Sequence, residues 1–157
     1  PTCTSLGAVA ARAASAAGVT VHEGGTYLAM EGPQFSTRAE SAVYRSWGAN
    51  VIGMTALPEA KLAREAELCY TTLAFVTDYD VWHDTKEEVT VEMVIQNLTH
   101  NVATAQGIIR RMLAEIPDNR TCGCESALKN AVITSRESIT KDAQNRLGIL
   151  VNKYLNA

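Results

Sequence analysis

The sequence has no excess of positive charge, little cysteine and no long apolar run, and each absence excludes a class of protein. Its 14 lysines and arginines against 17 acidic residues give a net charge of -3, so no positive field would attract a nucleic acid. No apolar run could cross a bilayer, and the start lacks a basic segment followed by an apolar block. Four cysteines are too few for a disulfide scaffold, and only Cys122 and Cys124 are close in sequence. We expect a cytoplasmic protein that binds neither nucleic acid nor membrane.

A chain of 157 residues with 46% hydrophobic and 20% charged residues has the composition of one globular domain. If compact, it would expose about 7,700 Å² and bury roughly two thirds of the surface of the unfolded chain. We expect residues 1–117 to form the main part of the domain. Residues 118–157 would be a helical C-terminal extension of it.

The first fifty residues contain a predicted helix, two short strands and a second helix. Residues 4–17 are rich in alanine and are followed by a glycine, which favours a helix. Residues 19–22 and 26–30 flank Glu23-Gly24-Gly25, which predicts a hairpin or strand pair. Thr37 and Glu40 have the spacing of a capping box, so a second helix is predicted over residues 37–47.

The next segments alternate between strand and helix. Residues 51–54 and 70–77 have the composition of strands, and residues 58–67 between them begin with a proline, which favours a helix there. Such alternation is typical of a parallel α/β layer, whose ligands bind beyond the carboxyl ends of the strands. Met54, Thr55 and the acidic residues from Asp78 onward lie at such ends.

Helices are predicted for the rest of the chain. Apolar residues recur at three- and four-residue spacing from Val91 to Met112, and Pro117 ends the pattern, which predicts one long helix with a core-facing stripe. A short helical stretch over residues 125–131 and a last helix over residues 140–155 follow. The expected fold class is therefore α/β, with a mixed sheet flanked by helices.

The richest cluster of chemically active residues runs from Asp78 to Asp84, directly after the apolar run 70–77. Carboxylates gathered at a strand end repel one another, which raises the pKa of at least one and suits a general acid. An ordinary solvated acidic turn would have the same composition. A third interpretation is a metal-dependent hydrolase with Asp78, Asp80 and His83 as ligands, although no second ligand cluster accompanies them.

A second candidate segment, residues 30–40, joins a strand to a helix through Gly32 and Pro33. The first backbone N–H groups of a helix offer a ligand unpaired donors and a partial positive charge. By itself the pattern is also typical of an ordinary capped helix, with Phe35 as a core aromatic residue.

The run from Gly32 to Glu40, Gly-Pro-x-Phe-x-Thr-x-Ala-Glu, resembles the motif of the trimeric purine nucleoside phosphorylase family. Residues 48–55, Pro58-Glu59 and residues 74–80 are similar to motifs of its methylthioadenosine branch, in the same order and spacing. The family cleaves the N-glycosidic bond of a purine nucleoside with inorganic phosphate and needs no metal or organic cofactor. The resemblance implies phosphorolysis of 5′-methylthioadenosine to adenine and 5-methylthioribose 1-phosphate, and a phosphorylase fold.

The resemblance also implies a role for each matching residue. Asp78 would donate a proton to N7 of the leaving adenine, and Asp80 would accept from its exocyclic amino group. Branches that act on 6-oxopurines differ at Ser36, Asp78 and Asp80, so adenine is the expected base. The other implied contacts are Phe35 and Ser36 in the base pocket, Met54 at the ribose, Thr55 at the phosphate, and Val91, Val94 and Ile95 around the 5′-methylthio group.

The resemblance covers only about the C-terminal half of a family member. The phosphate loop and an arginine-histidine pair of the N-terminal half have no counterpart here. We therefore expect a companion N-terminal chain, and a homotrimer or a dimer of trimers. The alternative is a fragment that binds a nucleoside, or serves assembly, without catalysis.

Cys122 and Cys124 resemble the Cys-x-Cys of some thermophilic relatives, where the pair forms a redox-active disulfide. Two free thiols in a turn are the alternative. Two thiols alone are insufficient for a zinc site.

Overall fold

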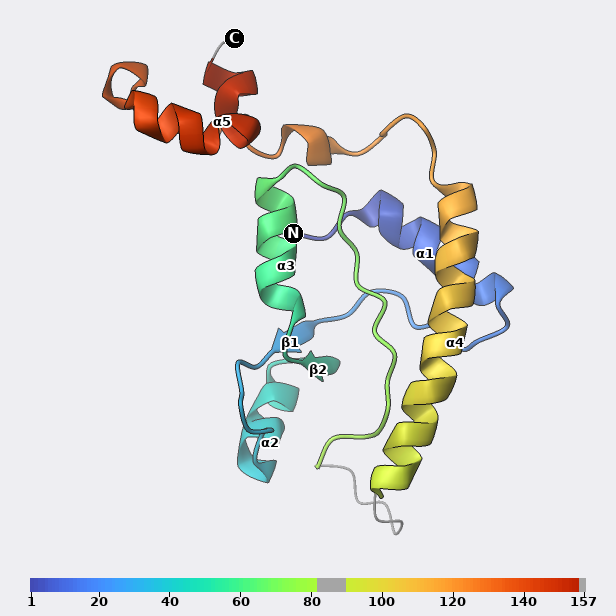
Figure 1. Cartoon of the computed structure of the whole chain (residues 1–157). Helices are drawn as coiled ribbons and strands as arrows, with labels where there is room; N and C mark the ends of the chain where they lie inside the picture. The colour runs from blue at the N-terminus through green and yellow to red at the C-terminus, as the bar shows by residue number, and fades with distance from the viewer. Residues whose placement is uncertain (82–89, 156–157) are drawn as a thin grey trace.

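The computed structural model describes residues 1–81 and 90–155 and has an α/β fold, as predicted (Figure 1). Its elements are α1 (Thr4–Ala16), β1 (Tyr27–Ala29), α2 (Arg38–Ser46), β2 (Val51–Gly53), α3 (Ala56–Glu65), α4 (Val91–Glu115), the short 3-10 helices η1 (Gly123–Ser126) and η2 (Arg136–Ser138), and α5 (Lys141–Leu155). The predicted helices are present with bounds shifted by one or two residues, except residues 125–131, where only the short η1 and turns are found.

The core lies where α1 packs against the C-terminal half of α4 (Figure 1). Ala13 and Ile108 are almost completely buried there, and Met112 lies in the same cluster. The alanines of α1 allow this close approach because they present little more than a methyl group each. An exposed ion pair between Arg12 and Glu115, at 3.3 Å, joins the same two helices and adds little stability.

The N-terminal half of α4 does not carry the core-facing stripe that its apolar spacing predicts. Only Ile108 and Met112 of this helix are buried, whereas Leu98 and Val102 are about half exposed. The reason is that α1 covers only the C-terminal part of α4 (Figure 1). A long apolar stripe on α4 is therefore open to contact with other groups.

The sheet of the described residues consists of β1 and β2, which are parallel, with Leu28 opposite Ile52. The predicted pairing of residues 19–22 with residues 26–30 is wrong. Val19 and Val21 pack against the core instead, and β1 pairs with the strand that follows α2. A helical crossover between two strands returns the chain in the same direction, which makes the pair parallel.

Residues 70–77 form no strand in the described structure, contrary to prediction. Residues 71–77 nevertheless alternate between half-buried and exposed positions, and Leu73 and Phe75 pack against the core. This is the period of a strand with one face buried. A strand also requires a neighbour that completes its hydrogen-bond ladder, and the described residues supply none along this segment.

Local sequence signals explain the bounds of α2 and α3. Thr37 caps α2 as predicted, and Glu40 completes the capping box. α3 begins at Ala56, two residues before Pro58, because proline is tolerated throughout the first turn, where no backbone donor is needed.

The chain exposes 11707 Å², well above the value of about 7,700 Å² for a compact chain of this size. The predicted burial is therefore not reached. No helix within the described ranges is both long and apolar enough to cross a membrane.

Candidate functional site

Asp78 and Asp80 follow a backbone segment that α4 holds in place. The side-chain amides of Asn97 and Asn101 donate to the carbonyl oxygens of Thr77 and Val76, at 2.8 and 3.1 Å. The Thr77 hydroxyl donates to Asp78 Oδ2 at 2.7 Å. Asp78 is exposed and Asp80 is half-buried. The backbone that leads into Asp78 is therefore bonded to α4, and Asp80 Oδ1 accepts from the Val81 N–H at 2.8 Å.

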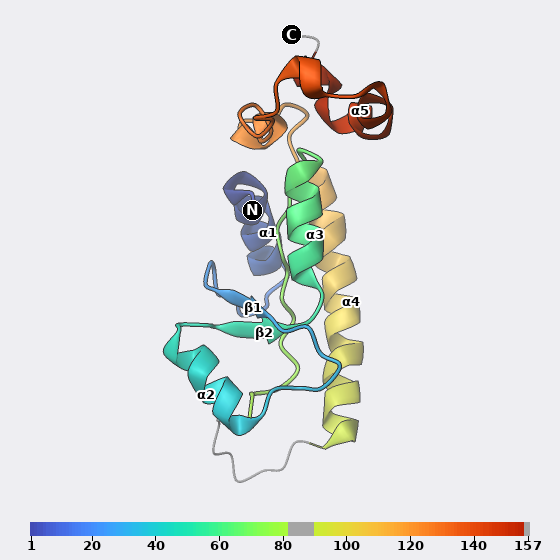
Figure 2. The ribbon, with the colours of Figure 1, turned by 90° about the vertical axis from the view of Figure 1, so that its left-hand side faces the viewer.

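Three of the predicted site segments lie at the same end of the molecule. In Figure 1 the chain before residue 82 ends between α2 and the N-terminal end of α4, and in Figure 2 it reaches the same end beside α2. α2 follows the segment with Phe35 and Ser36, and α4 begins at Val91. The segments that carry the base-pocket candidates, the acidic pair and the 5′-pocket candidates therefore lie at one end of the molecule (Figures 1 and 2).

The loop that leads into α2 presents an aromatic ring to solvent. Phe35 is 82% exposed, so the interpretation of this residue as a core aromatic is wrong. The Ser36 hydroxyl pairs at 2.8 Å with that of Ser41, which is buried. Thr37 donates to Glu40 through its backbone N–H, at 2.6 Å, and through its hydroxyl, and these bonds lower the pKa of Glu40. The end of the loop is therefore fixed while its aromatic ring is free to contact a ligand.

Met54 connects the end of β2 to this loop. Its methyl group lies against Gly32, where any side chain would collide with it. Gly32 also has a positive φ of 79°, a conformation that favours glycine. This close approach brings the predicted ribose residue to the start of the predicted base-pocket loop.

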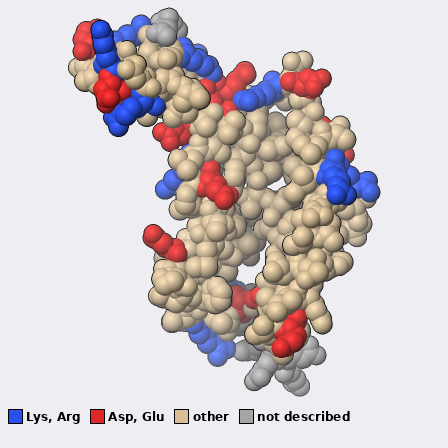
Figure 3. Space-filling model, viewed as in Figure 1, with Lys and Arg blue, Asp and Glu red and all other residues tan. Residues whose placement is uncertain are grey.

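Thr55 is exposed and lines a hollow of about 460 Å³, together with Glu59, Tyr70 and Phe75. The space-filling view shows the face hollowed between α3 and α4, with few charged side chains around the hollow (Figure 3). The predicted phosphate residue thus lies at an open depression on this face.

The predicted 5′-pocket residues lie on the first two turns of α4. Val91 is 69% exposed, Ile95 is 56% exposed, and Val94 is half-buried. They form an apolar surface rather than an enclosed pocket within the described residues.

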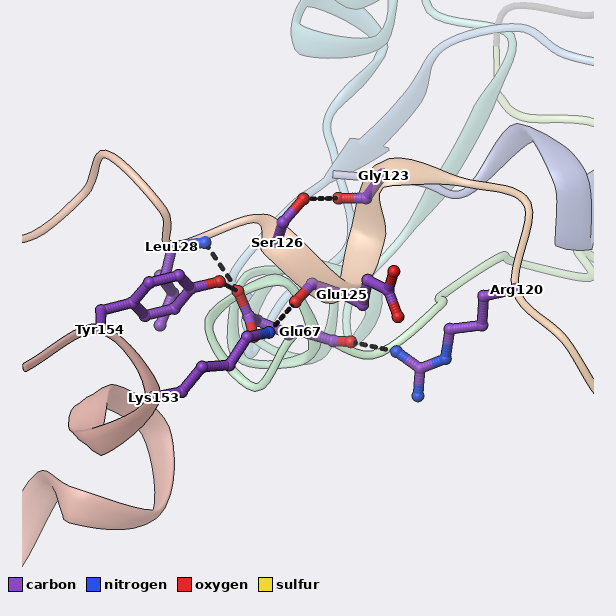
Figure 4. Close-up of polar contacts among 8 residues, drawn as sticks. All are labelled: Glu67, Arg120, Gly123, Glu125, Ser126, Leu128, Lys153 and Tyr154. Carbon is purple, nitrogen blue, oxygen red and sulfur yellow. Dashed lines mark hydrogen bonds and ion pairs between the residues drawn. The ribbon is translucent and has the colours of Figure 1, made fainter. Parts of the chain in front are cut away.

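The opposite end of the molecule contains a dense polar contact around Glu67 (Figure 4). Its carboxylate accepts from Lys153 Nζ at 2.7 Å, from the Leu128 N–H at 3.0 Å and from the Tyr154 hydroxyl. Its backbone carbonyl accepts from Arg120 Nη1 at 2.9 Å. Partial desolvation disfavours the charged carboxylate, but the donors Lys153, Tyr154 and Leu128 together hold the pKa of Glu67 at about 2. This contact anchors the segment after α4 to the end of α3.

All four cysteines of the chain meet beside this anchor, and sequence reasoning missed this. The sulfur atoms of Cys3, Cys69, Cys122 and Cys124 all lie within 4.8 Å of one another, and all four are free thiols. The hydrogen bond between the thiols of Cys69 and Cys122 raises the pKa of Cys69, whereas the backbone N–H of Cys124 and this same hydrogen bond lower the pKa of Cys122 to about 7. The one clue in the sequence was the number of cysteines, because four thiols are enough for one tetrahedral metal site.

These thiols are the only group of three or more candidate metal ligands within residues 1–81 and 90–155. The hypothesis of a metal-dependent hydrolase invokes Asp78, Asp80 and His83. His83 lies outside the described residues.

Comparison with known proteins gives consistent results. The Phosphorylase superfamily matches residues 1–114. An S-methyl-5′-thioadenosine phosphorylase of Geobacter sulfurreducens is 50% identical over 155 residues, which are 99% of this chain and 54% of that protein. Many other relatives match as well.

Two solved structures show the same fold. A methylthioadenosine phosphorylase from an antarctic soil metagenomic library superposes with a TM-score of 0.87 and 41% identity, over 96% of this chain and 54% of that one. A methylthioadenosine phosphorylase of Schistosoma mansoni in complex with adenine gives a TM-score of 0.70 and 30% identity, over 81% of this chain and 50% of that one. The chain spans about half the length of these relatives, and it belongs to the Phosphorylase superfamily.

Proposed function

We propose that this chain contributes the base, ribose and 5′ contacts of an enzyme that cleaves 5′-methylthioadenosine with phosphate. The observation that carries the proposal is the 50% identity, over nearly the whole chain, to a relative named for this activity. The Schistosoma relative solved with adenine supports the choice of base.

The proposed chemistry addresses a poor leaving group. As the C1′–N9 bond lengthens, negative charge develops on the adenine, and a proton from Asp78 to N7 neutralises it. A phosphate oxygen then bonds to C1′ of an oxocarbenium-like ribosyl group, which gives 5-methylthioribose 1-phosphate. The contact of Asp78 strengthens in the transition state, so it accelerates the reaction rather than only binding the substrate. The hold of α4 on the carbonyl groups of Thr77 and Val76 supports such positioning.

The exocyclic amino group of adenine would donate to Asp80, while Phe35 and Ser36 line the base pocket. Met54 would contact the ribose, and its contact with Gly32 supports one continuous pocket for base and sugar. Thr55 would donate to phosphate from the hollow that it lines. The exposed apolar start of α4, with Val91, Val94 and Ile95, would contact the 5′-methylthio group.

The rest of the active site would come from a companion N-terminal polypeptide and from neighbouring subunits of a trimer or a dimer of trimers. The large exposed surface of the chain and the apolar stripe on α4 support further covering partners, because extensive apolar surface usually marks an interface. We also propose that residues 118–157 belong to the same domain as residues 1–117, that the enzyme is cytoplasmic, and that phosphorolysis requires no cofactor.

The direct test is to incubate the full protein with 5′-methylthioadenosine, with and without phosphate, and to quantify the products. We expect adenine and 5-methylthioribose 1-phosphate in equal amounts, and only with phosphate. Adenine released together with free 5-methylthioribose, or a reaction abolished by chelation, would instead indicate a hydrolase. Nucleoside binding without any product would indicate a fragment that binds but does not catalyse.

A further inference from the structure

Four thiols from three separate segments meet at one point near the end of α3. Cys3 precedes α1, Cys69 follows α3, and Cys122 and Cys124 lie at η1. Their sulfur atoms lie within 4.8 Å of one another, and the sulfurs of Cys69 and Cys122 are 3.4 Å apart. The chain has four cysteines in all, so every thiol that it contains is in this cluster.

Contacts that do not involve sulfur hold the three segments together. The backbone N–H of Cys3 donates to the carbonyl of Tyr70 at 2.7 Å, which joins the start of α1 to the residue after Cys69. Arg120 and Leu128, on either side of Cys122 and Cys124, both donate to Glu67 (Figure 4). The fold therefore places the thiols near one another independently of any bond between them.

The separation of the sulfurs suits a tetrahedral metal site. Zinc binds thiolates at about 2.3 Å, which places the sulfurs of a tetrahedral set about 3.8 Å apart. The cluster, with one pair at 3.4 Å and all pairs within 4.8 Å, requires shifts of about 1 Å or less to reach this geometry. A disulfide between Cys69 and Cys122 would instead require their sulfurs to approach from 3.4 Å to about 2.05 Å, and would leave Cys3 and Cys124 outside the bond.

The surroundings of the cluster are those of a structural site rather than a reactive one. Cys3 and Cys124 are buried, and Cys69 and Cys122 are half-buried. The Leu6 N–H donates to Cys3 Sγ at 3.4 Å, as outer donors do around metal-bound ligands. Four protein ligands would leave no open coordination position for a substrate.

We propose that Cys3, Cys69, Cys122 and Cys124 bind one structural zinc ion in a tetrahedral all-thiolate site. Thiolate ligands in this geometry select zinc or iron, and we choose zinc because four cysteines are a common ligand set of structural zinc sites. Binding replaces the four S–H protons, which pass to solvent, with four Zn–S bonds. The ion connects the start of α1, the end of α3 and the segment after α4, and lies at the end of the molecule opposite Asp78 (Figure 1). It is therefore consistent with a phosphorolysis that uses no metal.

The first experiment measures metal in the full protein, purified under reducing conditions without chelator. We expect about one zinc per chain, because four thiolates hold one tetrahedral ion. Replacement by cobalt should give intense visible ligand-field bands of tetrahedral Co²⁺ and near-ultraviolet bands of thiolate-to-cobalt charge transfer. Iron in place of zinc, four freely reactive thiols without metal, or disulfides found after alkylation under denaturing conditions would each overturn the proposal. None of these results depends on a variant that folds.

The second experiment uses variants at Cys122. Cys122→Ser removes a ligand and should weaken zinc binding more than about 100-fold, since loss of an outer partner alone costs 10- to 100-fold. Cys122→His should retain the ion, because imidazole is also a zinc ligand. Ser126→Ala is the matched control, since Ser126 lies in the same 3-10 helix and bonds only to the Gly123 carbonyl among the contacts described. If Cys122→Ser bound zinc as tightly as the wild type, Cys122 would not be a ligand and the proposal would be wrong.

Discussion

At one end of the molecule the polar groups already have partners among the described residues, whereas at the other end many side chains are exposed. At one end, Glu67 accepts from four donors and four thiols lie together. At the other end, Asp78 and Phe35 are exposed, and the first half of α4 presents apolar side chains to solvent.

This difference separates a structural role from a binding role. Polar groups that already have partners stabilise the fold but have little capacity left for a ligand. Exposed carboxyl, aromatic and apolar groups gathered on one end can still contact a nucleoside. We therefore expect substitutions at the Asp78 end to change catalysis, and substitutions at the Glu67 end to change stability.

Asp78→Asn should have the largest effect. Without a group that can give N7 a proton, kcat/KM for phosphorolysis of 5′-methylthioadenosine should fall about 10²- to 10⁴-fold. Glu67→Gln, the same type of change at the opposite end, should leave kcat/KM near the wild-type value. Steady-state kinetics of both variants in the full protein gives the two values of kcat/KM. An equal loss of kcat/KM in both variants would contradict the distinction between the two ends.

Asp80→Asn should change the choice of base rather than abolish turnover. An amide can donate to a 6-oxo group, whereas a carboxylate opposes it with a second acceptor, a mismatch of about 1–3 kcal/mol. The ratio of kcat/KM for 5′-methylthioadenosine to that for 5′-methylthioinosine should therefore fall about 10- to 100-fold. Asp118→Asn, an exposed acid after α4, is the control, and a ratio unchanged in Asp80→Asn would exclude the proposed amino contact.

Glu67→Gln should lower the thermal stability of the protein in a pH-dependent manner. The pKa of Glu67 in the folded protein, about 2, is lower than the ordinary value of about 4.3. The ionised carboxylate therefore contributes its full stabilisation at pH values above about 4.3. This contribution is lost as the pH falls through the window from about 4.3 to about 2.

The difference in Tm between the wild type and Glu67→Gln should accordingly shrink across that window. Glu65→Gln, at the exposed last residue of α3, serves as the control for the loss of one negative charge. A Tm difference that is independent of pH would contradict the anchoring role of the ionised carboxylate.

Thr37→Ala should have the smallest effect. It removes the hydroxyl half of the capping box at α2 and leaves the backbone N–H of residue 37 to donate to Glu40, and it should cost about 1 kcal/mol of unfolding free energy. Ser46→Ala, at the other end of α2, removes an exposed hydroxyl and should stay within about 0.5 kcal/mol. Denaturant unfolding of both variants provides the comparison, and equal losses would show that the cap does not stabilise this loop.

Local signals in the sequence predicted most of the helices and both observed strands, β1 within residues 26–30 and β2 within residues 51–54. The capping-box residues Thr37 and Glu40 gave the start of α2, and the apolar run 51–54 gave β2. Residues 70–77, predicted as a strand from their composition, form none, although exposure alternates over residues 71–77, because a strand depends on a neighbour as well as on its own period. Residues 26–30 were expected to pair with residues 19–22, their neighbours in sequence. The composition of these short runs does not show that β1 pairs with β2 instead.

The candidate site could be predicted only where its residues belong to motifs that are continuous in the sequence. The motif resemblance identified residues that the fold brings to one end, from Ser36 at α2 to Val91 at α4. Their roles toward a ligand stay predictions. The cluster of Cys3 with Cys69 and η1 is formed by contacts between segments far apart in sequence, such as that of Arg120 with Glu67. Spacing along the chain carries no signal for such contacts.

The most direct measurement is a crystal structure of the full protein with adenine and phosphate. The account predicts the Asp78 carboxyl group about 2.6–3.2 Å from N7 of adenine, with Asp80 in reach of the exocyclic amino group. Adenine bound elsewhere, with both carboxyl groups facing bulk solvent, would contradict it.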